Sequence, residues 1–386
     1  MPVIVLSQFC CTSLWFAGNG VMPDLVQTFS LGASALGNLT SAVQFGFISG
    51  TLVFAFLTVA DRFSPSRVFL FSALIGAMFN TGVAWDGNSY YSLLLLRFGT
   101  GFFLAGIYPV GMKIAADYYD KGLGKSLGFL VGALVLGTAF PHLLKSIGQI
   151  LPWKLVVYTT SGLALSGGLL MFLFVPDGPH RKRIQQFDFS AFFKVFGKPE
   201  FRSAAFGYFG HMWELYAFWA FVPVILGTYN SFNPDVKLNI PLLSFFIIGI
   251  GGLACVLGGY LSMKWGAKKI AYLALLSSCL CCFLSPIVFL AKSEVLFNGF
   301  LLFWGMVVIA DSPLFSTLVA KNAEAKNKGT ALTIVNCLGF AITIVSIQLL
   351  TLLQKHLPGS YLYLPLALGP VIGLFALSYK RVKSSQ

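Results

Sequence analysis

Long runs of apolar residues recur along almost the whole chain, and they limit what it can fold into more than any other feature. A helix that spans a bilayer needs roughly 20 apolar residues, and runs of that length follow one another here. Hydrophobic residues make up 57% of the chain and charged residues only 10%, whereas a soluble protein carries about a quarter charged residues. Membrane β-barrels need alternating segments of about ten residues. Because the runs here are continuous, they predict an all-α membrane protein.

Twelve membrane spans account for these runs. We expect them at 3–28, 38–60, 66–86, 89–114, 125–147, 153–175, 203–228, 239–262, 268–291, 294–319, 329–353 and 360–380. One long polar stretch, 177–202, separates the first six spans from the last six. The sequence therefore predicts two six-helix bundles, 1–176 and 203–386, joined by a basic cytoplasmic linker at 177–202.

Lysine and arginine residues gather in alternate loops, as they do on the cytoplasmic side of membrane proteins. With the N-terminus inside, the outside loops hold only Lys145, Lys154, Lys237, Lys292 and Lys355. The inside loops hold 20 basic residues: Arg62, Arg67, Lys113, Lys121, Lys125, Arg181, Lys182, Arg183, Lys194, Lys198, Arg202, Lys264, Lys268, Lys269, Lys321, Lys326, Lys328, Lys380, Arg381 and Lys383. This bias predicts a multi-pass protein of the bacterial inner membrane with both termini in the cytoplasm. Topology and anionic lipid headgroups explain the net charge of +13, so nucleic acid is not an expected partner.

The two halves contain a weak internal repeat. The turn ADRFSPSR (60–67) corresponds to SMKWGAKK (262–269), with an offset of 202 residues between Asp61 and Met263. GKSLGFLVG (124–132) corresponds to GTALTIVNC (329–337) with an offset of 205, and Pro109 corresponds to Pro313 with an offset of 204. Near-equal offsets in chain order indicate a duplicated six-helix unit.

With these features the whole chain resembles the major facilitator superfamily of transporters. The first turn keeps Asp61, Arg62 and Arg67 of the superfamily's loop motif, with Leu57 and Ser64 where the motif has glycine. The second copy keeps the residues Gly259, Lys264, Gly266, Lys268 and Lys269 and has Met263 at the acidic position. RFGTGFFLAG (97–106) is similar to the superfamily's span-four pattern Arg-x-x-x-Gly.

This resemblance implies twelve helices in two pseudo-symmetric bundles, transport by alternating access, no cofactor, and a monomer. It also implies that Asp61, Arg62, Arg67 and Lys264 form a conformational latch. GHMWELYAFW (210–219) and ADSPLFSTLVA (310–320) loosely resemble the nitrate/nitrite and cyanate porters of the superfamily. Nitrate porters are expected to carry an arginine in spans two and eight, and neither span has one here. Nitrate is therefore not predicted as the solute of this protein.

Charged residues inside the spans are the main candidates for transport chemistry, because each costs roughly 2.5–3.5 kcal/mol on insertion scales. Arg97 lies in span four, Glu214 with His211 in span seven, and Asp311 in span ten. The superfamily resemblance implies that spans one, four, seven and ten line the central cavity. We therefore predict a substrate site from Trp15, Asn19, Arg97, Tyr108, His211 and Trp304. Proton coupling is assigned to Glu214, His211 and Asp311.

Each of these residues also has a structural interpretation. His211 and Glu214, three residues apart on one helix face, would then clamp span seven to a neighbouring helix. Asp311 precedes a proline by two residues, as a helix N-cap does, and would then mark a break in span ten. Arg97 either binds an anionic solute or acts as a strut.

The function predicted from these observations is secondary active transport of a small anionic or zwitterionic solute, coupled to protons. A carboxyl group at membrane depth can hold a proton because burial favours its neutral form. One alternative is proton-driven efflux of hydrophobic or cationic compounds, and another is a membrane sensor with a transporter fold. The sequence has no Walker loop, hydrolase elbow or zinc-site spacing, so neither an enzyme nor a metal site is expected.

Overall fold

The computed structural model describes residues 1–119, 123–147, 152–181, 195–324 and 328–378. These ranges are helical and contain no strand. Nine helical segments among them are long and apolar enough to cross a membrane. Helix α6 and the shorter apolar helices at either end of the described chain supply the other three predicted spans. The predicted all-α membrane class is therefore confirmed, and the chain is an integral multi-pass protein.

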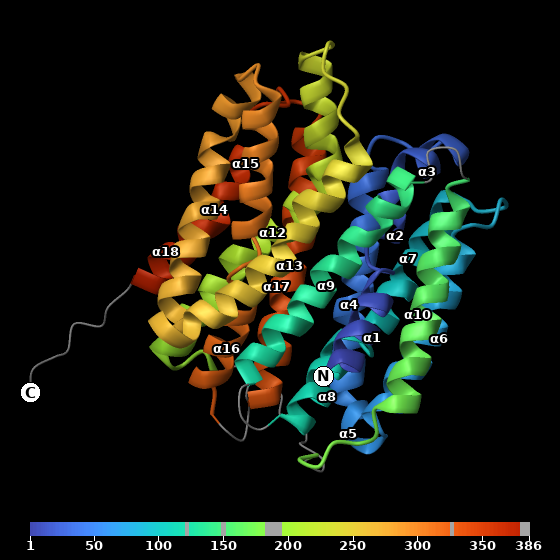
Figure 1. The fold of residues 1–386 in the computed structure, drawn as a ribbon, viewed down its shortest axis with the longest axis vertical. Coiled ribbons are helices and arrows are strands. Elements are labelled where there is room, and N and C mark those ends of the chain that lie inside the picture. The colour runs from blue at the N-terminus through green and yellow to red at the C-terminus, as the bar shows by residue number, and fades with distance from the viewer. Residues whose placement is uncertain (120–122, 148–151, 182–194, 325–327, 379–386) are drawn as a thin grey trace, which may run out of the picture.

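The helices of the first half lie together on one side of the molecule (Figure 1). They are α1 (Pro2–Thr12), α2 (Ala17–Gly20), α3 (Met22–Thr28), α4 (Ala35–Phe56), α5 (Val59–Arg62), α6 (Pro65–Gly82), α7 (Tyr90–Leu104), α8 (Tyr108–Tyr118), α9 (Leu123–Ile147) and α10 (Lys154–Phe174). The helices of the second half lie on the other side. They are α12 (Pro199–Phe232), α13 (Ile240–Trp265), α14 (Ala267–Leu290), α15 (Glu294–Val307), α16 (Ser312–Asn322), α17 (Lys328–Leu353), the 3₁₀ helix η2 (Leu364–Ala367) and α18 (Leu368–Ser378).

Three of the predicted spans are interrupted rather than continuous. Span one breaks between α1 and α2, span four between α7 and α8, and span ten between α15 and α16. Pro109 and Pro313, the pair that the internal repeat brings into correspondence, each lie at the start of the helix that follows a break. Proline lacks an N–H and fixes φ, so the first turn of a helix is the position that it fits best. The break that one of the two interpretations of Asp311 implied is present: Asp311 is the N-cap residue of α16, although its side chain makes no capping hydrogen bond.

Close backbone approaches hold the two halves together along α9 and α13. A Cβ atom added to Gly132 would lie 3.0 Å from the carbonyl oxygen of Gly252, and one added to Gly252 would lie 3.1 Å from that of Gly132. Small residues at such positions let membrane helices pack at short range. The outer surface carries large exposed side chains, including Phe45, Leu95 and Phe375, as expected where lipid is the solvent.

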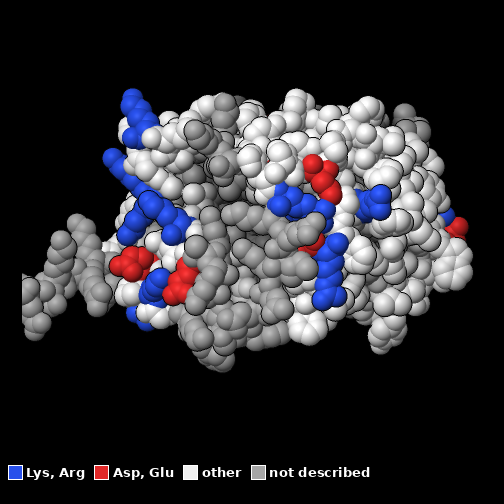
Figure 2. All heavy atoms as spheres, turned by 90° about the horizontal axis from the view of Figure 1, so that it is seen from below, with Lys and Arg blue, Asp and Glu red and all other residues white. Residues whose placement is uncertain are grey.

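The two ends of the molecule differ in charge. Lysine and arginine side chains gather on the face at the end of α5 and α8 (Figure 2), called the basic face below. At the opposite end Lys145 and Lys154 form ion pairs of 2.7 and 2.5 Å with Asp24 and Asp86. Eight basic residues of the predicted inside set lie outside the described residues: Lys121, Lys182, Arg183, Lys194, Lys326, Lys380, Arg381 and Lys383. Most of the predicted linker, 182–194, also lies outside them.

Candidate functional site

A cavity of about 410 Å³ lies between the two halves at the basic face. Helices α4, α8 and α9 provide one wall, and α16 and α17 provide the other. The lining residues are Thr51, Phe54, Ala55, Thr58, Ala60, Asp61, Ala105, Pro109, Val110, Met112, Lys113, Ala116, Leu127, Ser316, Ala320, Gly329, Thr330, Leu332, Thr333 and Asn336. We call this space the vestibule.

A second cavity, of only about 20 Å³, continues the vestibule toward the middle of the molecule. Met112, Ser316 and Asn336 line both cavities, so the two are contiguous. The small cavity is rich in aromatic side chains, with Tyr108 on one side and Tyr208 on the other. The hydroxyl group of Tyr208 donates a hydrogen bond of 2.6 Å to Oδ1 of Asn336.

Four aromatic rings close the path beyond the small cavity. Trp15 and Phe47 come from the first half, and Tyr216 and Phe340 come from the second. The Trp15 ring stacks on Tyr216 and Phe340 at centroid distances of 5.7 and 5.6 Å, and Phe47 lies 4.5 Å from Phe340. Each of the four side chains is at most 3% exposed. We call this group the aromatic seal, because its rings fill the space between the halves.

Uncharged polar contacts join the halves further toward the end that lies opposite the basic face. The side-chain amide of Gln348 in α17 donates hydrogen bonds to Oδ1 of Asn38 (3.1 Å) and to Oγ of Ser41 (2.9 Å) in α4. Gly37 packs directly against Thr351, leaving no room for a Cβ atom. The molecule is therefore open between its halves at the basic face and closed at the other end.

Arg97 is bound at the break in span one. Its guanidinium donates hydrogen bonds to the backbone oxygens of Leu14 (3.3 Å) and Trp15 (2.5 Å) and to Oδ1 of Asn80 (3.2 Å). The residue is 1% exposed, and no carboxylate of the described chain forms an ion pair with it. Arg97 lines neither cavity. The structure thus favours the strut interpretation, and it removes the observation behind the predicted anionic solute.

Glu214 lies inside the second half, against α14 and α15. Its Oε1 accepts hydrogen bonds from the hydroxyl of Ser278 (2.5 Å), the indole of Trp304 (2.6 Å) and the thiol of Cys282 (3.3 Å). The side chain is 1% exposed. Three donors on one oxygen suit an ionised carboxylate, and they tie span seven to span nine and to the first part of span ten.

His211 contacts Asp311 at the break in span ten. Its Nδ1 lies 2.8 Å from Oδ1 of Asp311, and both side chains are 1% exposed. Phe315 and Tyr208 flank the imidazole ring at centroid distances of 6.0 Å. Ser312 directly follows Asp311 and lines the small cavity. The pair therefore lies one residue from the cavity wall without lining it.

The predicted binding residues are only partly brought together. Tyr108 lines the small cavity, and Trp15 belongs to the aromatic seal. Asn19 instead donates a hydrogen bond of 2.8 Å to Thr40, within the first half. His211 and Trp304 face the interior of the second half rather than either cavity.

Apart from Asp61, the polar residues of the vestibule were not predicted as site residues. Hydroxyl-bearing residues are frequent in these spans, and no charge or spacing distinguished the ones that line a cavity, such as Thr51, Thr58 and Ser316. The roles assigned to the predicted residues stay predictions.

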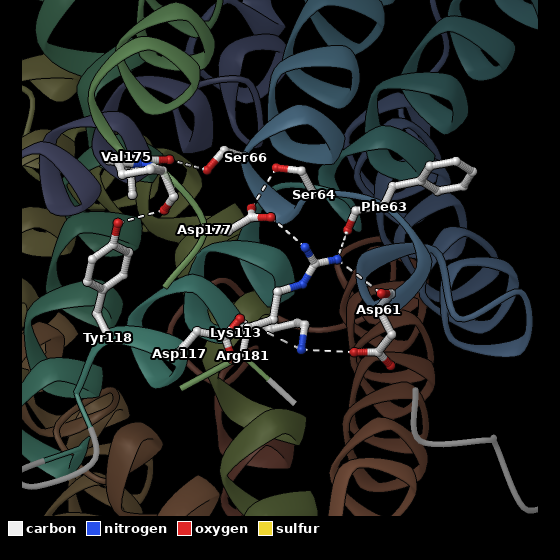
Figure 3. A network of polar contacts seen from close by, with 11 residues as sticks. Asp61, Phe63, Ser64, Ser66, Lys113, Asp117, Tyr118, Val175, Asp177 and Arg181 are labelled. Atoms are coloured by element: carbon white, nitrogen blue, oxygen red, sulfur yellow. Dashed lines mark hydrogen bonds and ion pairs between the residues drawn. The ribbon is translucent and has the colours of Figure 1, made fainter. Parts of the chain in front are cut away.

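A polar network surrounds the turn at Asp61 (Figure 3). Lys113 Nζ lies 2.9 Å from Oδ1 of Asp61 and 3.9 Å from Oδ2 of Asp117. Arg181 donates to the backbone oxygens of Asp61 (3.0 Å) and Phe63 (2.7 Å), and it also pairs with Asp177. The network joins the turn to α8 and to the segment after α10, within the first half.

Of the predicted latch residues, the described network contains Asp61 alone, and the latch stays a prediction. Arg62, Arg67 and Lys264 are exposed and lie outside this network, and Lys264 stands over the Trp265 ring at 5.6 Å. Lys113 and Arg181 hold Asp61 instead. Both come from distant parts of the chain, so the local motif could not indicate them.

Comparison with known proteins places the chain among transporters. A family model described as Major Facilitator Superfamily matches residues 4–377. A protein named "Probable sugar efflux transporter" from Helicobacter pylori (strain G27) is 23% identical over 291 residues, which cover 72% of this chain and 69% of that protein. The 4-hydroxybenzoate transporter PcaK of Pseudomonas aeruginosa is 28% identical over 151 residues, which cover 36% of this chain and 33% of that protein.

Solved structures share the fold at low sequence identity. A proton:xylose symporter matches with a TM-score of 0.77 and 14% identity, over 97% of this chain and 93% of that one. The human organic anion transporter MFSD10 matches with a TM-score of 0.73 and 16% identity, over 98% of both chains. These findings support the twelve-helix superfamily fold, and they do not support the nitrate/nitrite and cyanate porter branch.

Proposed function

Because the chain belongs to the Major Facilitator Superfamily and is a secondary transporter, we propose that it moves a small solute by alternating access and draws on a proton gradient. The observation that carries this proposal is the vestibule of about 410 Å³, which lies between the halves at one end. The aromatic seal and the Gln348 contacts close the other end. One end open and one end closed is the arrangement that alternating access requires.

The basic face is proposed to be cytoplasmic, so the described state is open to the cytoplasm. Enrichment of Lys and Arg on that face supports this orientation (Figure 2). Both termini would then lie inside, in a bacterial inner membrane. The bundles 1–176 and 203–386 would rock as two bodies about the seal, with 177–202 as the linker between them, in a monomer surrounded by lipid.

Glu214, His211 and Asp311 are the proposed proton-coupling residues. Glu214 holds α15 through Trp304, and His211 contacts Asp311 at the start of α16. Protonation of Glu214 would remove the charge that its three donors satisfy, and protonation of the His211–Asp311 pair would change the contact at the break. Either event would change how the two parts of span ten are held. Because α16 carries cavity-lining Ser316, a proton would alter the vestibule wall.

Transport by purified protein in proteoliposomes tests this proposal. The names of the relatives suggest radiolabelled monosaccharides and 4-hydroxybenzoate as the first solutes. Gln348 reaches Ser41 with the end of a long side chain, so a short bifunctional methanethiosulfonate, rather than a direct disulfide, should bridge Ser41→Cys and Gln348→Cys. This cross-link should lock the closed end and stop transport, and a reductant should restore it. Transport that persists in the cross-linked protein would refute alternating access at this seal.

Replacing Glu214 separates coupling from transport. Glu214→Gln keeps an acceptor oxygen for Ser278 and Trp304 but cannot ionise. We expect it to lose accumulation driven by a pH gradient while keeping solute counterflow. If Glu214→Gln accumulates solute against its gradient as the wild type does, Glu214 is not the coupling residue.

A further inference from the structure

We infer that the vestibule contains a binding site for an uncharged solute that combines hydroxyl groups with an apolar face, and that Thr51 and Thr58 are its hydrogen-bonding residues. The inference rests on the proposed function, since the solute would enter or leave through this cavity. It assigns a chemical class to the solute and places a first contact at the end of α4, away from the buried charges of spans four, seven and ten.

Two buried hydroxyl groups in the vestibule wall are unpartnered. Thr51 and Thr58 are 7% and 8% exposed, and both line the cavity. Neither Oγ1 atom has a hydrogen-bond partner within the part of the chain that the structure describes. Buried polar atoms in native proteins are nearly always paired. Both oxygen atoms are themselves covered by protein, so a molecule in the cavity would pair them by turning the hydroxyl group about χ1 into the cavity.

The backbone at Thr58 is held in an unfavourable conformation. Its φ of 49° lies in the left-handed region, which a β-branched residue rarely adopts. Such residues cluster at ligand sites and switch regions, where the surrounding structure holds them. The strain lies at the turn between α4 and α5, three residues before Asp61. The strained residue thus lies on the same wall of the cavity as the unpartnered hydroxyl groups.

The charges among the described lining residues favour an uncharged solute over an ionic one. Within that described lining, Asp61 and Lys113 are the charged residues, and they neutralise each other at 2.9 Å. An ion bound against them would lose hydration without gaining an unpaired counter-charge from them, which is unfavourable. The remaining polar lining residues, Ser316, Thr330, Thr333 and Asn336, lie on the second half and are uncharged.

The rest of the lining sets the shape of the solute. Phe54, Ala105, Pro109 and Leu332 contribute apolar surface beside the hydroxyl groups. The volume of about 410 Å³ falls among small-molecule sites, which range over roughly 300–1,000 Å³. A molecule the size of an aryl glycoside or a nucleoside, with one apolar face and several hydroxyl groups, fits both the volume and the wall.

Binding of matched probes to the full-length protein in detergent tests the inference. Phenyl β-D-glucoside is uncharged, and phenyl β-D-glucuronide has the same scaffold with a carboxylate. We expect isothermal titration calorimetry to show saturable binding of the glucoside and binding of the glucuronide at least tenfold weaker. Thr51→Val and Thr58→Val remove one hydroxyl each and keep the β-branched shape. Each should weaken glucoside binding about fivefold, the usual effect of one neutral hydrogen bond.

Thr138→Val is the matched control. Thr138 also carries a buried hydroxyl without a partner in the described chain, but it lines neither cavity. Its variant should bind the glucoside as the wild type does, and all three variants should elute from gel filtration as the wild type does. Failure of the glucoside to bind, equal or tighter binding of the glucuronide, or unchanged affinity in both Thr51→Val and Thr58→Val would overturn the inference. Cross-link-sensitive transport of any solute would leave the proposed function standing in each case.

Discussion

Replacing Arg97 by leucine is expected to destabilise the protein no more than replacing it by lysine. Arg97 donates three hydrogen bonds. Two go to the backbone oxygens of Leu14 and Trp15 at the break in span one, and one goes to the side chain of Asn80 in α6. Hydrogen bonds between membrane helices contribute about 0.6 kcal/mol on average and at most about 1.7 kcal/mol. Three of them contribute about 2–5 kcal/mol by that measure.

The buried charge works against these contacts. An arginine or lysine at membrane depth costs about 2.5–3.5 kcal/mol on insertion scales. Arg97→Leu loses all three hydrogen bonds but also removes this cost, so its net effect lies within about 2.5 kcal/mol of zero. A lysine keeps the charge and can place its single ammonium near only one of the three acceptors, so two contacts are lost. Arg97→Lys should therefore cost about 1–3.5 kcal/mol.

Unfolding of the purified variants in mixed micelles by sodium dodecyl sulfate measures these differences. Arg67→Leu is the control, because Arg67 is an exposed arginine outside any described polar contact. It should change the free energy of unfolding by less than about 0.5 kcal/mol. If Arg97→Leu is much less stable than Arg97→Lys, the acceptor oxygens left unpaired by leucine cost more than the buried charge does, and the reasoning above is refuted.

Three further perturbations have defined outcomes. Gly46→Ala should destabilise the fold by about 1–3 kcal/mol in the same unfolding assay, because its Cβ would lie 2.0 Å from the Phe98 backbone oxygen, while Gly299→Ala has open space and should not. Equal stabilities would show that α4 and α7 can separate at little cost. Gln348→Leu removes two contacts at the closed end, so a thiol at Ser41→Cys should react faster with a membrane-impermeant reagent; an unchanged rate would show that the amide does not hold the seal. Arg181→Leu should raise the proteolysis rate of the turn at 59–64 with little effect on global unfolding, and unchanged cleavage would contradict its role there.

The positions of the spans could be predicted because lipid imposes a long apolar run on every crossing. Every predicted span coincides with described helix, and the break before Pro313 was one of the two interpretations that the sequence Asp-Ser-Pro allowed. The break in span one was not predicted, since residues 13–16 contain neither glycine nor proline. At that break Arg97 binds the backbone oxygen of Trp15, a contact over 82 residues of chain that no local pattern records.

The direction of the charged side chains could not be predicted from spacing. His211 and Glu214 share a helix face, but protein surrounds most of α12. In an apolar stretch of 18 residues within this helix, 78% is buried. A helix that is apolar on every side gives no periodicity from which to separate a cavity from a helix–helix contact. Both side chains point into the second half, toward Asp311 and Trp304, and the vestibule is lined by ordinary threonine and serine residues instead.

The two halves are closed against each other at the aromatic seal and at Gln348. All of the described contacts in this closure are made by uncharged groups. Screening by salt acts on charges and leaves such contacts almost unchanged. Burial of apolar rings, in contrast, carries a heat-capacity change and weakens on cooling. The closure of this end should therefore respond to temperature and hardly at all to ionic strength.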